Sequence, residues 1–139
     1  MNKNFYIEVN SLQRNHDEER ICGDVFLYRY INEEDRVVAV LSDGMGHGVK
    51  ANILATLTST MALNFTREHK EVDRIAEIIM NTLPVCSERK VSYSTFTIVD
   101  IESQGKATIL EYDNPPAIVL RGKREFDPGW KNVVLEKGK

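Results

Sequence analysis

Residues 37–57 place the tightest limit on the fold, because a continuous apolar run meets a glycine-rich turn there. The run VVAVLS (37–42) predicts a strand that is covered on both faces, since its apolar residues follow one another without alternation. Asp43 comes directly after this run, and three glycines lie within the next five residues. The sequence therefore puts a carboxylate at the carboxyl end of a buried strand, beside main chain that carries no side chains.

Two amphipathic helices are predicted after the glycines, over residues 49–69 and 71–84, because apolar residues recur there at helical spacing. Pro84 ends the second helix, since proline cannot continue one. Each helix then has one stripe of side chains to bury against a sheet. The stripes consist of Ile53, Leu54, Leu57, Met61 and Phe65 in the first helix and of Val72, Ile75, Ile79 and Leu83 in the second.

Strand-like segments precede and follow this helical pair. Three strands, two helices and three further strands form a segregated order, which favours an α+β fold over a parallel βαβ array. The short links between the later strands predict antiparallel pairing, and NEEDR (32–36) reads as a hairpin connection. The predicted strands are 5–12, 21–31, 37–42, 91–101, 106–113 and 117–122, and the tail beyond them is rich in turn residues.

Length and charge exclude several functional classes. The 139 residues fit one domain, and a net charge of -3 without a basic stripe argues against a nucleic-acid partner. The short basic clusters at 67–70 and 121–125 are expected to be solvated surface. No apolar run has the length of a membrane span, and the first ten residues lack the apolar core of a signal peptide. Cys22 and Cys86 have no metal-ligand spacing, so reduced thiols in a cytoplasmic protein are expected.

A second carboxylate, Asp24, lies near the start of the strand that precedes Asp43. If these strands form a hairpin, the start of one lies beside the end of the other, and the two carboxylates come close together. Such a pair repels unless a cation lies between them or one is protonated. Oxygen ligands suit magnesium or manganese better than zinc, and Gly44 can offer a carbonyl oxygen. The three residues are thus candidate ligands for a metal pair that lowers the pKa of a shared water and binds a phosphoryl oxygen.

Other interpretations of this cluster remain open from the residues alone. Asp-Gly after a strand is an ordinary turn, and Asp43 can cap the next helix. The glycines could form a phosphate-binding loop, although neither GxxxxGK[ST] nor GxGxxG is present. His47 could donate a proton to a leaving oxygen or could bond to the local backbone. His16 and His69 are expected to be simply exposed.

The segments ICGDVFLYRYI (21–31) and RVVAVLSDGMGHGVKANILATLTSTMAL (36–63) resemble the metal-dependent serine/threonine protein phosphatases of type 2C, the PPM class. They are most similar to the bacterial branch typified by the stage II sporulation E phosphatase. YSTFTIVDI (93–101) and ATILEYDNPPAIVLR (107–121) resemble later strands of that branch. The resemblance implies a layered αββα sandwich of antiparallel sheets flanked by helices.

The resemblance also implies the site. Asp24 and Asp43 would hold two manganese or magnesium ions, with Asp43 bridging and the carbonyl of Gly44 completing the ligand set. A metal-bound water would then hydrolyse phosphoserine or phosphothreonine without a covalent phosphoenzyme. The implied substrate is a phosphorylated protein, such as a sigma-factor-regulating or other signalling protein.

Two features depart from the family pattern. The branch usually carries a further Asp-bearing segment, so residues 1–139 are expected to be a single domain that lacks its C-terminal part. Thr97 stands where many relatives have an acidic residue, and a hydroxyl is a poor ligand for a divalent ion. The alternative is therefore a catalytically inactive phosphatase-like module that binds a regulatory phosphoprotein. A nucleotide-binding module is the weaker rival.

Overall fold

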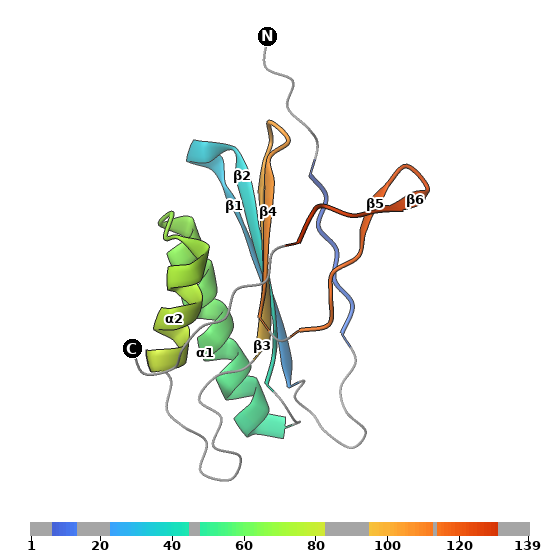
Figure 1. Ribbon diagram of the computed structural model, residues 1–139. Helices are drawn as coiled ribbons and strands as arrows, with labels where there is room; N and C mark the ends of the chain where they lie inside the picture. The colour runs from blue at the N-terminus through green and yellow to red at the C-terminus, as the bar shows by residue number, and fades with distance from the viewer. Residues whose placement is uncertain (1–6, 14–22, 45–47, 83–94, 113, 131–139) are drawn as a thin grey trace.

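The computed structural model describes residues 7–13, 23–44, 48–82, 95–112 and 114–130, and every structural statement below concerns these residues. In chain order the elements are β1 (Asp24–Ile31), the 3-10 helix η1 (Asn32–Glu34), β2 (Arg36–Asp43), α1 (Gly48–Arg67), α2 (Val72–Thr82), β3 (Thr95–Glu102), β4 (Ala107–Tyr112), β5 (Val119–Arg121) and β6 (Arg124–Phe126). The first four strands form one antiparallel sheet in the order β1-β2-β3-β4 (Figure 1). The predicted α+β class is confirmed.

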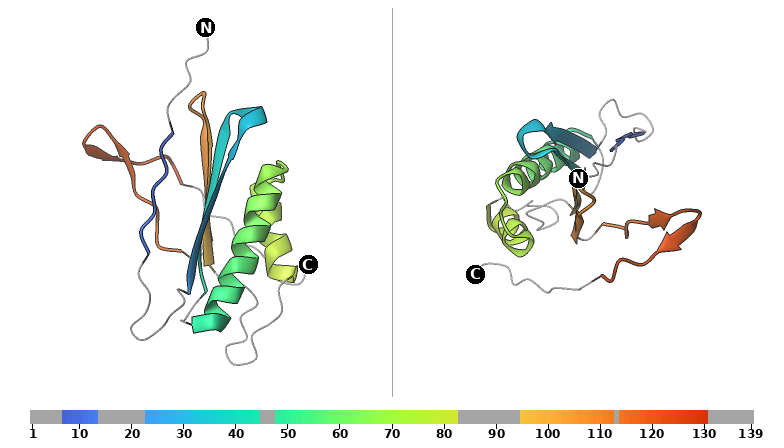
Figure 2. Two further views of the ribbon diagram at one scale, coloured as in Figure 1. Left: turned by 180° about the vertical axis from the view of Figure 1, so that it is seen from behind. Right: turned by 90° about the horizontal axis from the view of Figure 1, so that it is seen from above.

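Both helices pack on the same face of the four-stranded sheet (Figure 2). The core lies between these two layers, where branched and aromatic side chains of β2 and β3 meet small and aliphatic residues of the helices. Within the described ranges, neither helix has the length and apolar character that a bilayer crossing needs. The core residues are Ile31, Val38, Val40, Phe96 and Ile98 from the sheet and Ala62, Leu63, Ile75, Ala76 and Ile79 from the helices.

Strand β2 is covered less completely than its apolar run predicts. Side chains alternate between the two faces of a strand, and Val38, Val40 and Ser42 are fully buried on the side of the helices. On the opposite side, Val37 is buried but Leu41 is 47% exposed. The prediction of cover on both faces is therefore wrong at the carboxyl end of β2, because no second layer packs over it among the described residues.

Helix α1 buries a different stripe from the predicted one. Ile53 and Leu57 are 53% and 43% exposed, so the prediction of a buried stripe is wrong for these two residues. Apart from Leu63, the buried side chains of α1 are instead small, namely Ala51, Ala55, Thr58, Ser59, Ala62 and Thr66. Small residues let the helix backbone approach the sheet closely, which explains why the larger side chains turn outward. In α2, the predicted burial of Ile75 and Ile79 is confirmed.

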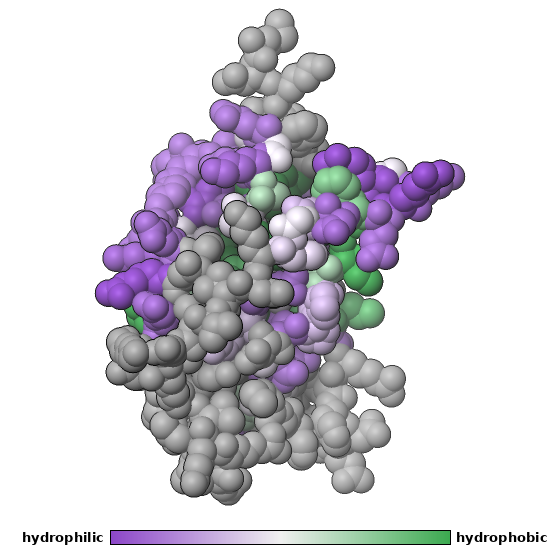
Figure 3. Space-filling model, viewed as in Figure 1, coloured by the Kyte–Doolittle hydropathy of each residue, from purple (hydrophilic) through white to green (hydrophobic). Residues whose placement is uncertain are grey.

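The two ends of the described chain form little regular structure. The strand predicted over 5–12 is wrong for its described residues, since none of residues 7–12 belongs to a strand. The strand predicted over 117–122 is confirmed only as the short β5, which pairs with the unpredicted β6. This hairpin projects from the body, hydrophilic at its tip and hydrophobic toward its base (Figure 3). Leu120 of β5 and the nearby Ile118 are exposed. Of the layered sandwich, the described residues thus form one helix layer, one full sheet and one small hairpin.

Candidate metal centre

Asp24 and Asp43 lie directly opposite each other in the β1–β2 strand pair. The 3-10 turn Asn32–Glu34 closes the hairpin at its other end, so the register follows from two strands of equal length joined by a short connection. Because Ser42 faces the helices, the neighbouring Asp43 points to the opposite face of the sheet, and its partner Asp24 shares that face. The predicted meeting of the two carboxylates is confirmed.

The surroundings of Asp24, including Asp43, perturb its carboxyl group. Partial burial, the negative charge of Asp43 and a hydrogen bond with the Asp43 side chain, in that order, raise the pKa of Asp24 above its usual value. Burial and a like charge both disfavour a second negative charge at the same place. A divalent cation between the two oxygen donors would relieve this repulsion, so the donor set fits a hard metal ion.

Gly44 has a structural role that spacing alone did not predict. Its amide donates a hydrogen bond to the carbonyl oxygen of Gly23 at 3.0 Å, which extends the β1–β2 pairing past the two carboxylates. A Cβ atom at Gly44 would lie 1.9 Å from the carbonyl oxygen of Ala51. The first turns of α1 therefore pack directly on the main chain beside the carboxylates, and only glycine leaves room for them.

The sequence also drew attention to His47 and Thr97. His47 lies outside the described residues. Thr97 lies on the same face as Asp43, opposite Leu41, and its Oγ1 accepts a hydrogen bond of 2.9 Å from Nδ2 of Asn114. The same amide approaches the carbonyl oxygen of Leu41 at 3.3 Å. Thr97 thus anchors the loop after β4 to the sheet.

A metal at this point would have a small protein ligand set. Among the described residues, no group of three or more His, Cys, Asp or Glu side chains is arranged to hold a metal ion. Asp24 and Asp43, with the main-chain carbonyl of Gly44 as a candidate third donor, suit an ion that keeps several water ligands. Magnesium binds in this way, through one or two carboxylates together with water and substrate phosphate.

Sequence reasoning missed an ionic network around the buried Arg36, at the other end of β2. Arg36 is 2% exposed and donates from Nε to Asp100 at 2.7 Å and from Nη1 to Glu34 at 2.5 Å. Nε2 of His69 lies 2.8 Å from the other carboxylate oxygen of Glu34, so this exposed histidine is paired. Burial opposes the charge of Arg36, but the two carboxylates outweigh it and raise the arginine pKa. The sequence feature that could have indicated this network is an arginine at the start of an apolar run.

Comparison with known proteins indicates the class of protein to which this fold belongs. The fold is similar to the crystal structure of RsbX in complex with magnesium, with a TM-score of 0.53 and 18% sequence identity. The alignment covers 74% of this chain and 58% of that one. A four-stranded antiparallel sheet with helices on one face matches part of the fold of the PP2C-type phosphatases.

The particular family follows from the sequence. A family model described as stage II sporulation protein E (SpoIIE) matches residues 33–136, so the chain belongs to the SpoIIE family. No curated protein matches the chain. The matched range includes Asp43, Gly44 and Thr97 but begins after Asp24. The assignment of Asp24 as a candidate metal ligand therefore depends on its position opposite Asp43. That residues 1–139 form one domain without its C-terminal part stays a prediction.

Proposed function

We propose that this chain carries the metal site of a serine/threonine protein phosphatase. The observation that carries the proposal is the direct pairing of Asp24 with Asp43, whose like charges call for a cation, in a chain of the SpoIIE family. Asp24, Asp43 and the carbonyl of Gly44 would hold manganese or magnesium. The magnesium bound to RsbX supports this choice of ion.

When bound, such ions supply a water of lowered pKa and neutralise charge on the phosphoryl oxygens. The residues of this chain would hold these ions in a fixed position. Asp24 and Asp43 are held by a regular strand ladder, and Gly44 is clamped between Gly23 and the first turns of α1. Ligands on rigid elements keep the accurate geometry that this chemistry requires. His47 is proposed, as a further member of the site, to protonate the leaving oxygen.

The proposed substrate is a phosphorylated protein rather than a small metabolite. The Asp24–Asp43 pair lies at an exposed end of the sheet, where a phosphorylated side chain on a protein surface could reach it. The proposed substrate is more specifically a regulatory phosphoprotein, such as one that controls a sigma factor. The proposed location of the chain is the cytoplasm.

Manganese binding to the 139-residue chain tests the metal site. Manganese is expected to raise the melting temperature, and Asp43→Asn is expected to abolish this increase because it removes one of two charged ligands. Glu33→Gln, in the 3-10 turn at the other end of the hairpin, is the matched control and should keep the full response. An unchanged manganese response in Asp43→Asn would remove Asp43 from the site.

Phosphate release from a phosphoserine peptide, with manganese or with chelator, then tests catalysis. Metal-dependent release that Asp43→Asn abolishes supports the phosphatase. Metal binding without release supports the second candidate, an inactive phosphatase-like module. One observation favours that candidate: among the described residues no third acidic side chain joins the pair, and Thr97 is engaged by Asn114.

A further inference from the structure

The Thr97 hydroxyl lies near the Asp24–Asp43 pair, on the same face of the sheet. Asp43 lies opposite Thr95 in the β2–β3 ladder, and Thr97 is two residues farther along β3, opposite Leu41. Residues two apart on a strand share a face, so Thr97 and Asp43 are diagonal neighbours, about 7–8 Å apart. This distance is too long for a direct contact, but a small group bound between the two positions can touch both.

Asn114 fixes the direction of this hydroxyl. Its Nδ2 donates to Thr97 Oγ1 at 2.9 Å and approaches the main-chain carbonyl oxygen of Leu41 at 3.3 Å. A carbonyl oxygen can only accept a hydrogen bond, so the amide nitrogen, and not the amide oxygen, must face this point. Thr97 Oγ1 is therefore the acceptor in its bond with Asn114 and keeps its single hydrogen for another partner.

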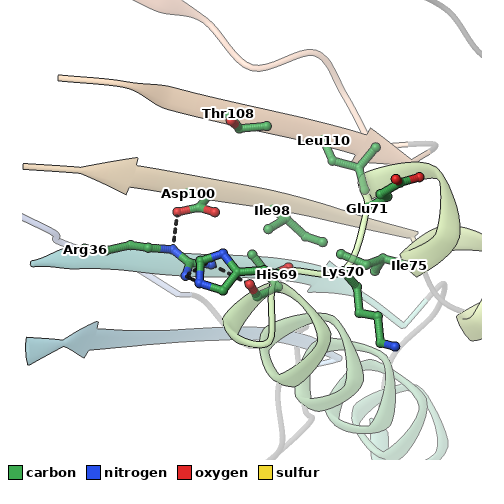
Figure 4. A pocket seen from close by; sticks show the side chains of 10 residues that line it. Arg36, His69, Lys70, Glu71, Ile75, Ile98, Asp100, Thr108 and Leu110 are labelled. Carbon is green, nitrogen blue, oxygen red and sulfur yellow. Dashed lines mark hydrogen bonds and ion pairs between the residues drawn. The ribbon is translucent and has the colours of Figure 1, made fainter. Parts of the chain in front are cut away.

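The remaining hydrogen of Thr97 is available to a ligand. Within the described ranges nothing accepts it, and the Thr97 side chain is partly exposed. Residues 114–118 leave the sheet on the side opposite the helices, so they border the same open face (Figures 1 and 2). Arg36, at the other end of the sheet, differs in this respect, because it is buried and donates to Asp100 (Figure 4). Thr97 is thus an accessible donor beside candidate metal ligands.

The charges around Thr97 limit which ligand its hydroxyl can bind. Glu111 lies opposite Thr97 on β4, and its Oε1 accepts a hydrogen bond from the Ala117 amide at 3.2 Å. Together with Asp24 and Asp43 it makes this face acidic, so the metal-free chain repels an anion. A divalent cation at the two aspartates is the larger local charge and reverses this preference. The hydroxyl then faces a place that suits an anionic oxygen.

We propose that Thr97 binds a phosphoryl oxygen of the substrate through its hydroxyl, which Asn114 orients, while the same phosphoryl group meets the ion at Asp43. The inference rests on the proposed function, which supplies both the ion and the phosphoryl group. Hydrogen bonds to a charged acceptor are stronger than hydrogen bonds between neutral groups. Thr97 therefore contributes to the affinity for the phosphate ester and for the inorganic phosphate product alike.

Binding of inorganic phosphate to the magnesium-loaded 139-residue chain tests the inference without requiring turnover. Isothermal calorimetry measures the affinity, and the threonine methyl signals in NMR locate the ligand. Phosphate is expected to bind only with magnesium and to shift the methyl signal of Thr97. The signal of Thr108, on the helix side of β4, should not shift. Phosphate binding that persists in chelator, or an unshifted Thr97 signal at high phosphate, overturns the inference.

Thr97→Val removes the hydroxyl at nearly constant shape. Its phosphate affinity is expected to fall at least about tenfold, as for the loss of one hydrogen bond to a charged group. Thr97→Ser keeps the hydroxyl and should keep most of the affinity, which a merely structural role of the threonine methyl group does not predict. Thr108→Val is the matched control and should leave the affinity unchanged. Equal phosphate affinity in Thr97→Val and the parent chain overturns the inference.

Asn114→Ala tests the orientation of the hydroxyl. The substitution should weaken phosphate binding in the parent chain but not in Thr97→Val, because the amide acts only through the hydroxyl and the two effects are then not additive. An equal loss in both backgrounds would contradict this role of Asn114.

Magnesium binding separates this inference from the proposed function. A parent chain that does not bind magnesium contradicts the proposed metal site, and the inference with it. A parent chain that binds magnesium, and that binds phosphate equally with and without the Thr97 hydroxyl, contradicts the inference alone. If Thr97→Val does not fold, the shift of the Thr97 methyl signal in the parent chain decides the matter.

Discussion

At Asp24 and Asp43, two acidic side chains occupy opposite positions of one strand pair and share a hydrogen bond. Their arrangement opposes the stability of the metal-free protein, because burial and a like charge both disfavour ionised Asp24. Proteins accept such local conflicts at functional positions. The conflict at this pair is therefore itself an argument for a bound cation.

Removing one charge should stabilise the metal-free protein. Asp24→Asn keeps the shape of the side chain and can donate a hydrogen bond to Asp43, so the free energy of unfolding in chelator is expected to rise by about 0.5–1 kcal/mol. Urea unfolding measures this change. Glu125→Gln, on the projecting hairpin, should leave the stability unchanged. A loss of stability in Asp24→Asn would contradict the repulsion.

Among the elements, α1 is distinguished by how closely it approaches the sheet. Its buried face is made mostly of alanine, serine and threonine, with Leu63 as the one large buried side chain among the described residues, and its Ala51 carbonyl contacts the main chain at Gly44. The larger Ile53 and Leu57 point outward as a consequence. This close approach joins the position of α1 to the position of the candidate metal ligands.

Gly44→Ala should therefore destabilise the fold sharply. The new Cβ would lie 1.9 Å from a backbone oxygen of Ala51, which cannot move without shifting the helix. A loss of about 3 kcal/mol is expected from overpacking of this kind. Chemical denaturation measures it, with Gly122→Ala as the comparison. Gly122 has φ +66 but nothing within 4 Å of a Cβ, so it should lose only about 1–2 kcal/mol. Equal losses at the two glycines would contradict the proposed contact.

Arg36 joins β2 to β3 through its ion pair with Asp100, and to the end of α1 through a hydrogen bond to the carbonyl oxygen of Thr66. Arg36→Met is expected to lower the free energy of unfolding by about 3–5 kcal/mol, because Asp100 is left without its partner in a partly buried place. Arg74→Met breaks an exposed pair with Glu77 on α2 and should change stability by less than about 1 kcal/mol. Thermal unfolding of both variants checks the difference. A small effect at Arg36 would show that its pairs contribute no net stability.

Over the whole molecule, a chain of polar contacts holds the top of the helix layer to the β1–β2 hairpin. Glu34 binds both His69 and Arg36, and Asp35 receives hydrogen bonds from Tyr30 and from Ser103 at the β3–β4 turn. These contacts lie at the opposite end of the sheet from Asp43. The two ends of the sheet thus differ: one is held by ion pairs and hydrogen bonds, whereas the other carries the exposed Asp24–Asp43 pair of like charges.

Stability in acid should depend on Glu34. Hydrogen bonds from His69 and then Arg36 lower the pKa of Glu34. A lowered carboxyl pKa contributes stability that is complete above the ordinary glutamate pKa and is lost as pH falls through the lowered value. In Glu34→Gln, the free energy of unfolding should therefore fall less steeply with acidification than in the parent chain. Unfolding series at several pH values measure the slope. Glu33→Gln should keep the parent slope, and an unchanged slope in Glu34→Gln would contradict the pairing.

The sequence by itself determined the parts that depend on local pattern. A helical repeat, a continuous apolar run over 37–42 and a short connection between 31 and 36 were enough to predict α1, α2 and the β1–β2 hairpin. Because the register of a hairpin follows from its turn, the meeting of Asp24 with Asp43 was also predictable. The resemblance carried by these same residues supplied the family.

Only the tertiary structure decided the contacts between elements that are distant in the chain. Arg36 and Asp100 are separated by 64 positions, and no spacing rule links them. The outward turn of Ile53 and Leu57 follows from the distance between α1 and the sheet, which the helical repeat does not encode. Likewise, Leu41 stays exposed because no second layer packs on it among the described residues. Periodicity indicates which side chains share a face, whereas only packing decides what that face contacts.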